Sequence, residues 1–148
     1  MSDALKIIKD DHRKVEAQFK KFESYGDRAV KAKQTTALLI CELLTVHAEM
    51  EEQIFYPKLL DKFKKKGDEL VDEAYAEHDV AKYLIAKIKT LPPEDPQFDA
   101  KVIVLKEYIA HHVQEEEKEL LPMTKKQFSK EELSEMGVEM ENFKNANA

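Results

Sequence analysis

The sequence is poor in the residues that interrupt helices and in those that cross-link small domains. Its 148 residues include 3 Gly, 5 Pro, 1 Cys and no Trp. The single Cys41 excludes an internal disulfide and fits a reducing compartment, so we expect a cytoplasmic protein. Because glycine and proline are scarce while Ala, Leu, Lys and Glu are abundant, the composition favours helices.

Long apolar runs and long runs of one charge are also absent. No stretch approaches the ~20 apolar residues that span a bilayer, and the first residues lack the apolar segment of a signal peptide. The net charge is −6, with acidic and basic residues interspersed. We therefore expect neither a membrane nor a nucleic acid as a partner. The length is typical of one domain, which we expect to cover residues 1–148.

Apolar residues recur at spacings of three and four along four stretches, which predicts four amphipathic helices. The expected ranges are 3–25, 28–64, 68–89 and 96–126. Short connections between them predict an all-α fold, an up-down-up-down antiparallel four-helix bundle over about 3–126.

Particular residues mark where these helices begin, end or become irregular. Gly26 and Gly67 are expected breaks, whereas Pro57 and Pro122 predict kinks, because proline lacks the N–H of a helical hydrogen bond. The capping box that starts at Ser129 opens a short C-terminal helix, to about residue 143, within a final segment 129–148. We expect residues 142–148 to be frayed.

Histidines interrupt the apolar stripe of every long helix. His12, His47, His78 and His112 each occupy a position where the pattern calls for an apolar residue. One such histidine is usually a core or boundary residue with a hydrogen-bond partner. One histidine on each of four helices indicates that the rings share a site in the bundle core.

Two of these histidines begin the same motif. His47-x-x-x-Glu51 and His112-x-x-x-Glu116 place an imidazole and a carboxylate on one face of a helix. Each motif continues with a second glutamate and has a proline ten residues after its histidine. The histidines, the motif glutamates and the prolines recur after 65 or 66 positions, which indicates two similar helical hairpins.

The motif glutamates also lie on the core stripes, where a carboxylate is costly unless it is paired or bound to a metal. A shared metal site uses every imidazole and neutralises both carboxylates, so we favour it over a purely structural polar network. Imidazole and carboxylate together suit iron, manganese or zinc. The predicted metal ligands are His12, His47, Glu51, His78, His112 and Glu116.

Other polar residues near the motifs have simpler interpretations. His111 lies one position off the stripe, so we place it beside the site rather than in it. Tyr75 and Tyr108 either hydrogen-bond near the site or pack with their hydroxyls in water. A solvated helix face is expected for Glu49, Glu52, Glu115, Glu117 and Glu119.

The ordered set of His12, His47-x-x-x-Glu51, His78 and His112-x-x-x-Glu116 resembles the hemerythrin-like family, whose members carry an HHE cation-binding domain. The resemblance implies two non-haem irons in the bundle core, joined by an oxo or hydroxo group, with zinc or manganese as possible substitutes. The four histidines would be terminal ligands and the two glutamates bridges. A small ligand such as dioxygen or peroxide would be the partner.

The chain also departs from the oxygen-carrying members of this family. Those have a further histidine one turn before the position of His78, where this chain has Ala74. Their second motif ends in an aspartate one residue further along, where this chain has Glu116 followed by Glu117. The resemblance therefore implies an additional open metal position, which favours redox chemistry over simple reversible oxygen carriage.

Two functions are consistent with these residues. The first is a metal-binding protein that binds, senses or buffers oxygen or iron. The second is a di-iron oxidoreductase that acts on peroxide, oxygen or nitric oxide. A bundle that holds zinc in the same ligands is a third interpretation.

Overall fold

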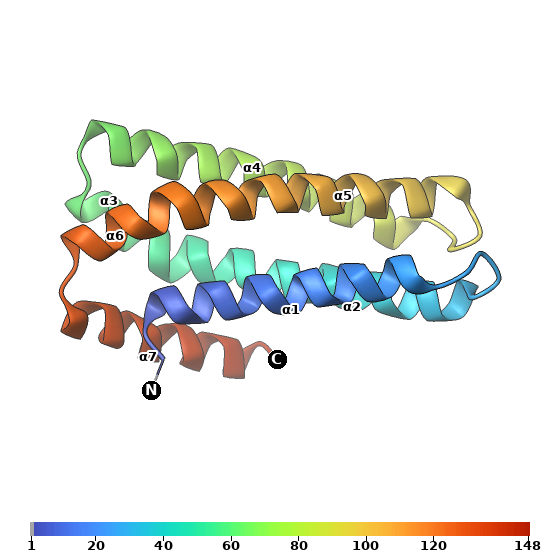
Figure 1. Ribbon diagram of the computed structural model, residues 1–148, viewed down its shortest axis with the longest axis horizontal. Coiled ribbons are helices and arrows are strands. Elements are labelled where there is room, and N and C mark those ends of the chain that lie inside the picture. The colour runs from blue at the N-terminus through green and yellow to red at the C-terminus, as the bar shows by residue number, and fades with distance from the viewer. Residues whose placement is uncertain (1) are drawn as a thin grey trace.

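Four long helical segments run alternately up and down, as the hydrophobic pattern predicts (Figure 1). The computed structural model describes residues 2–148, and no strand occurs among them. The elements in chain order are α1 (Ala4–Ser24), α2 (Val30–Met50), η1 (Glu51–Phe55), α3 (Tyr56–Lys62), α4 (Lys65–Thr90), α5 (Pro96–Glu115), η2 (Glu116–Leu120), α6 (Leu121–Gln127) and α7 (Lys130–Ala146). The predicted all-α bundle is thus confirmed, with α7 packed against α1, α2 and η1.

The helix starts follow from side chains that cap free backbone N–H groups. Asp3 accepts a hydrogen bond from the backbone of Lys6 at the start of α1. Asp95 does the same for Gln97 at the start of α5, where Pro96 begins the helix. Ser129 forms the predicted capping box that opens α7.

The irregularities predicted at the two prolines are π-helical turns. In η1 the N–H of Tyr56 bonds to the carbonyl of Glu51, five residues back. In η2 the N–H of Leu121 bonds to the carbonyl of Glu116 in the same way. A proline follows each turn and lacks the N–H needed to continue the regular ladder. Each motif glutamate therefore begins a widened turn.

Two predictions about helix ends are wrong. Gly67 does not end the second long segment, which stops at Lys62; it lies in the first turn of α4. A Cβ there would come within 2.5 Å of the Phe63 ring, so close packing explains this glycine. The C-terminal residues are not frayed from 142 onward, because α7 continues to Ala146.

The apolar core is divided into two clusters. The first lies towards the end where α3, α6 and α7 meet, and includes Ile8, Phe55 and Leu121. The second lies towards the loops 25–29 and 91–95, and includes Phe19 and Ile40. Buried histidines and glutamates occupy the layer between the clusters.

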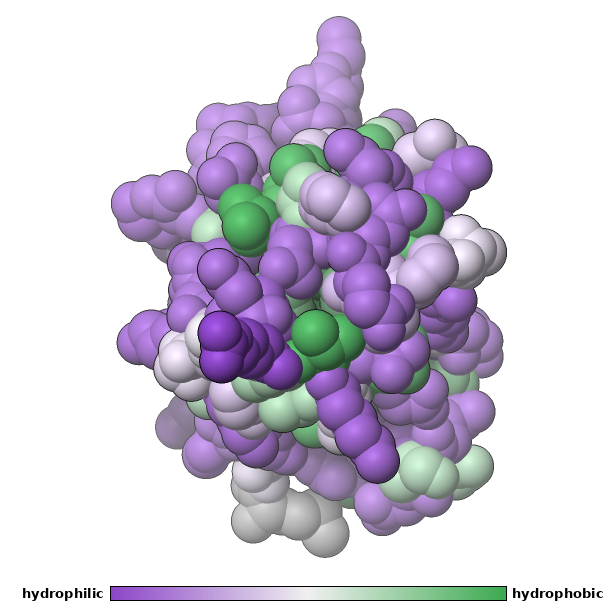
Figure 2. Space-filling model, turned by 90° about the vertical axis from the view of Figure 1, so that its right-hand side faces the viewer, coloured by the Kyte–Doolittle hydropathy of each residue, from purple (hydrophilic) through white to green (hydrophobic). Residues whose placement is uncertain are grey.

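The end of the bundle that carries the loops 25–29 and 91–95 has a mostly hydrophilic surface (Figure 2). Figure 2 shows the loop end of the bundle, where hydrophobic side chains form small separate patches among polar ones. Within the part of the chain that the structure describes, no helix is both long and apolar enough to cross a bilayer.

Candidate metal centre

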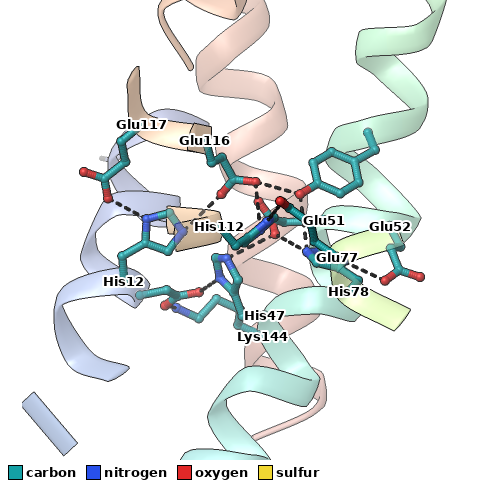
Figure 3. Close-up of polar contacts among 12 residues, drawn as sticks. His12, His47, Glu51, Glu52, Glu77, His78, His112, Glu116, Glu117 and Lys144 are labelled. Atoms are coloured by element: carbon teal, nitrogen blue, oxygen red, sulfur yellow. Dashed lines mark hydrogen bonds and ion pairs between the residues drawn. The ribbon is translucent and has the colours of Figure 1, made fainter. Parts of the chain in front are cut away.

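The six residues that the sequence predicts as metal ligands lie together in the polar layer between the two apolar clusters (Figure 3). They come from all four long helical segments, and every one of them is buried. The stripe positions and the i, i+4 spacing therefore identified six side chains that do lie together in the fold. Their role as ligands stays a prediction.

The six residues form two groups of three. In each group the potential ligand atoms lie within 4.8 Å of one another. One group has His12, His47 and Glu116, and the other has His78, His112 and Glu51. Each group thus takes its histidines from one half of the chain and its glutamate from the other half. The bundle therefore contains two buried His/Glu triads that suit a binuclear metal site.

Each glutamate lies between the two triads. Glu51 Oε1 is 3.2 Å from Nε2 of His47 and 3.2 Å from Nε2 of His78. Glu116 Oε1 is 3.1 Å from Nε2 of His12, and its Oε2 is 3.6 Å from Nε2 of His112. A carboxylate that faces histidines of both triads is placed to be shared by two cations.

A carboxylate fixes each imidazole from behind by hydrogen bonding to Nδ1. The N···O distances of the four pairs are 2.6–2.7 Å, and the pairs are His12–Glu117, His47–Asp11, His78–Glu52 and His112–Glu77. When the Nδ1–H of a neutral imidazole donates to the carboxylate, the lone pair of that ring is on Nε2. This atom faces the other predicted ligands. Partners of this kind orient histidine ligands in metal sites and raise their basicity.

These four carboxylates repeat in both halves of the chain. Asp11 and Glu77 directly precede His12 and His78, and each bonds to the second histidine of its own half. The glutamate after each motif glutamate bonds to the first histidine of the other half. The network therefore follows the same approximate two-fold symmetry as the ligands.

The carboxylates differ in the charges that lie outside them. Three of them bind cationic side chains, in the pairs Asp11–Lys144, Glu117–Arg13 and Glu52–Lys82. Glu77 has instead the exposed His111 ring, with an N···O distance of 3.8 Å. Lys144 belongs to α7, so the C-terminal helix reaches the candidate metal centre through Asp11 and His47 (Figure 3).

Tyr56 is a further member of the site. It is fully buried, and its hydroxyl donates to Glu116 Oε2 at 2.6 Å and lies 3.4 Å from Nε2 of His78. The π turn that starts at Glu51 brings Tyr56 there, because five residues complete that turn. Burial and the Glu116 and Glu51 carboxylates hold the pKa of Tyr56 well above its usual value, so the hydroxyl stays protonated.

The ionisable groups influence one another strongly when no metal is bound. Burial opposes the charge on His47, but Glu51 and the hydrogen bond to Asp11 outweigh it and raise the pKa of His47 well above 6.5. Burial also opposes the charge on His112, yet Glu77 and Glu116 raise its pKa to about 9. Burial alone would raise the pKa of Glu51, but His47 and then His78 hold it well below 4.5. In the metal-free protein the protonated His47 ring thus balances the charge of the ionised Glu51 carboxylate.

The inward-facing atoms fit a cation. Among the described residues, several buried side-chain atoms have no hydrogen-bond partner, and those at this site are Nε2 of His12, His47 and His112, both oxygens of Glu51 and Oε1 of Glu116. Buried polar atoms without partners are unusual and need an explanation. Here all of them belong to the two triads and face the same space. Metal ions in that space would give them partners.

An apolar cavity adjoins the histidines on the side away from Tyr56. It has a volume of about 220 Å³ and touches all four imidazole rings. Its other walls are mainly aliphatic, and include Val15, Leu44, Ile85 and Ile109. The site thus has a closed, tyrosine-bearing side and an open, apolar side.

The sequence interpretation missed the four carboxylates that bond to the histidines. Glu52 and Glu117 were placed on a solvated face, which is wrong, because both bond to buried histidines. Asp11 and Glu77 were not identified, although an acid directly before the first histidine of each half was a visible signal. His111 does lie beside the site, with its side chain 59% exposed.

The aromatic residues near the site differ from expectation in part. Tyr75 does pack near it, against Tyr56, and its hydroxyl donates to the Glu52 carbonyl at 3.4 Å. Tyr56 had no sequence signal in a regular helical register, because only the π turn brings it above Glu51.

Comparison with known proteins gives relatives over most of the chain. A family model described as the Hemerythrin HHE cation binding domain matches residues 3–124. A DNA nickase from Nostoc sp. is 31% identical over 133 residues, which are 90% of this chain and 36% of that protein. The chain therefore spans only about a third of the length of this relative. An uncharacterized hemerythrin-like protein from Schizosaccharomyces pombe is 28% identical over 144 residues, which are 97% of this chain and 68% of that protein.

A solved structure has a similar fold. The crystal structure of a hemerythrin HHE cation binding domain-containing protein from Mycobacterium kansasii superposes with a TM-score of 0.79 at 20% sequence identity. The match covers 99% of this chain and 90% of the other. It shows that the bundle described above is a hemerythrin-like fold.

Proposed function

We propose, from the premise that this chain belongs to the hemerythrin HHE cation-binding domain family, that it is a metalloprotein with two iron ions in the bundle core. In this proposal it binds, senses or buffers dioxygen or iron. The observation that carries the proposal is the orientation of the four imidazoles. Carboxylates hold all four Nδ1 atoms, while the Nε2 atoms and the Glu51 and Glu116 carboxylates converge.

The two triads supply the ligands. One ion would be held by His12, His47 and Glu116 and the other by His78, His112 and Glu51, with both glutamates shared. Imidazole and carboxylate ligands suit iron, and zinc or manganese also fits them. Bound iron would supply one-electron exchange with a small ligand such as dioxygen or peroxide.

The protein's own part is to orient the ligands and to control protons. On metal binding, His47 and His112 would lose the proton at Nε2 and keep the one at Nδ1, which Asp11 and Glu77 accept as a hydrogen bond. The Tyr56 hydroxyl would hold the Glu116 carboxylate in position. The first apolar cluster, which contains Tyr56, excludes water from the closed side of the layer.

A di-iron oxidoreductase acting on peroxide, oxygen or nitric oxide is the alternative. Ala74 favours it, since this buried residue lies one turn before His78 and offers no ligand atom. The cavity beside the histidines is also consistent with a reacting small molecule. DNA nicking, the activity in the name of the Nostoc relative, is not part of this proposal, because the chain corresponds to 36% of that protein and has a net charge of −6.

Metal analysis after loading with ferrous iron tests the proposal. We expect about two irons per wild-type chain and a marked loss of iron in His112→Ala. His111→Ala is the matched control, because this neighbouring ring is exposed and should leave the iron content unchanged. Wild-type protein that takes up no iron would contradict the proposal, and so would iron loss in His111→Ala but not in His112→Ala.

Two measurements on the loaded protein separate the main function from the alternative. Reversible dioxygen binding without turnover of peroxide would support a binder or sensor. Catalytic consumption of peroxide would support the oxidoreductase. In that case Ala74→His should slow the reaction, since a fifth imidazole would fill an open metal position.

A further inference from the structure

The cavity beside the metal centre is larger than a diatomic ligand needs. A water molecule occupies about 30 Å³ of liquid, and an apolar protein cavity of about 150 Å³ holds benzene. The cavity here measures about 220 Å³. Dioxygen, nitric oxide or hydrogen peroxide would leave most of it empty.

The two sides of this cavity differ in the size of their side chains. Val15 on α1 corresponds in the repeat to Ala81 on α4, and Val113 on α5 corresponds to Ala48 on α2. All four residues line the cavity. The α1–α5 side therefore carries two valines where the α2–α4 side carries two alanines.

The alanine side is also where the cavity meets solvent. Four of its lining residues are not buried, namely Thr45, Ala48, Glu49 and Lys82. The first three belong to α2 and Lys82 belongs to α4. An occupant would therefore enter the cavity between these two helices.

We propose that this cavity binds an uncharged organic molecule of about the size of benzene, with an apolar body and one hydroxyl-type head. The body would contact Val15, Leu44, Ile85 and Ile109, and the head would face the imidazole wall. The aliphatic walls favour an uncharged body, because a charge buried against them would lose its hydration.

This proposal extends the proposed function by naming an organic ligand class for the open side of the metal centre. Binding in the cavity needs no metal, because the walls are protein side chains. Only the placement of the head beside metal ions rests on the proposed function. The two can therefore fail separately.

Phenol is a suitable probe, since it is neutral at pH 7 and has the required shape. Nuclear magnetic resonance titrations of metal-free and zinc-loaded protein should show saturable shifts of amides near Leu44, Ala81 and Ile109.

The double variant Ala48→Val/Ala81→Val tests the location, because it gives the α2–α4 side the residues already present on the α1–α5 side. We expect phenol to bind at least tenfold more weakly, with the zinc content unchanged. Ala76→Val/Ala86→Val is the matched control, since both alanines are exposed on α4. Each single valine variant should have an intermediate effect, which provides the test if the double variant does not fold.

Several results would overturn the proposal. These are no saturable binding up to the solubility limit of phenol, shifts located away from the cavity, or equal affinity in the folded double variant and the wild type. Phenol binding in a protein that takes up no metal would leave the cavity proposal standing and would contradict the proposed function. Two metals per chain without phenol binding would support the proposed function and would contradict the cavity proposal.

Discussion

In the first half of the bundle α1, α2 and η1 supply His12, His47 and Glu51, and in the second half α4, α5 and η2 supply their counterparts. The ring centroids of the two histidines are 5.1 Å apart in the first half and 5.0 Å apart in the second. Each half also contributes two carboxylates that bond to Nδ1 atoms. The groups that face the centre are thus nearly equivalent.

The halves differ in what surrounds these groups. The first half has Tyr56 after its π turn, where the second half has Leu121. Asp11 of the first half binds Lys144 of α7, whereas Glu77 of the second half faces solvent-exposed His111. The repeat therefore builds the candidate metal centre, while differences between the halves provide a protonated donor and a contact with α7.

The largest effect on stability should come from removing the metal ions that both halves would bind. A metal bound only by the native state stabilises it by about 4 kcal/mol when free metal is 1,000 times Kd. We expect chelation to lower the melting temperature by more than about 5 °C, given roughly 2–4 °C per kcal/mol near this length. The metal-free protein should stay helical, because the apolar clusters lie outside the site.

A variant without the shared carboxylates provides the control for this experiment. Glu51→Gln/Glu116→Gln should bind little metal, so chelator should not shift its melting curve. Coincident melting curves for loaded and chelated wild-type protein, with loading verified, would mean that the six residues are not a buried metal site.

The fold and the inner ligands could be predicted because both depend on regular periodicity. The spacing of apolar residues located the helices, and the same spacing placed His12 and Glu51 towards the core. Asp11 and Glu77 escaped prediction because they lie beside the stripe and reach a histidine on another helix. Tyr56 escaped it because a π turn changes the register, so that residue i+5 rather than i+4 lies above Glu51.

The contribution of α7 could not be predicted for a different reason. The final segment has a clear start at Ser129, but its docking depends on tertiary contacts. Gly137 allows the close approach, since a Cβ there would lie 2.5 Å from the carbonyl oxygen of Ser2. Residues expected to fray instead continue the helix as far as Lys144 and Ala146.

Raising the pH should lower the stability of the metal-free protein but not that of the loaded protein. The pKa of His112 is raised from 6.5 to about 9 in the folded metal-free state, and that of His47 is also raised. Their stabilising contribution is therefore complete below about pH 6.5 and is lost as the pH rises through the folded pKa values. The free energy of unfolding of metal-free protein should fall by a few kcal/mol between pH 6.5 and 9.

The loaded protein should not show this loss, because metal replaces the protons at Nε2. At the acidic side, the lowered pKa of Glu51 gives stability that is present above about pH 4.5 and disappears as the pH falls through the folded pKa. Denaturant titrations of both forms at several pH values measure the difference. Parallel pH profiles would argue against metal binding at the histidines.

Removing one outer carboxylate from each half tests whether the halves are equivalent. Asp11→Asn and Glu77→Gln should each weaken metal affinity by about 10–100-fold, as is typical for partners of ligand imidazoles. Equal effects would show that the inner symmetry dominates. A competition titration with a coloured chelator gives the affinities, and Asp10→Asn is the control, because Asp10 is exposed and bonds only to Lys6. Loss of affinity in that control would contradict the assignment.

The tyrosine of the first half should contribute to stability more than its neighbour Tyr75. Tyr56→Phe removes a 2.6 Å hydrogen bond to the buried Glu116 carboxylate, and should lower the free energy of unfolding by about 1–3 kcal/mol. Tyr75→Phe removes only a long bond to a backbone carbonyl and should cost less than about 1 kcal/mol. Urea denaturation of the metal-free variants measures both. Equal costs would show that the Glu116 bond adds nothing beyond ring packing.

The smallest effect on stability and metal affinity should come from removing the contact between α7 and the first half. Lys144→Met leaves Asp11 bonded to His47 alone, but Lys144 is 23% exposed, so water screens part of the loss. We expect a cost of about 1 kcal/mol and a weaker loss of metal affinity than in Asp11→Asn. Lys130→Met, at the exposed start of α7, is the control and should change neither quantity. If Lys144→Met weakened metal binding as much as Asp11→Asn, α7 would be a required part of the centre. If it changed neither stability nor affinity, the first half would owe nothing to this contact, and Tyr56 would remain as the difference between the halves.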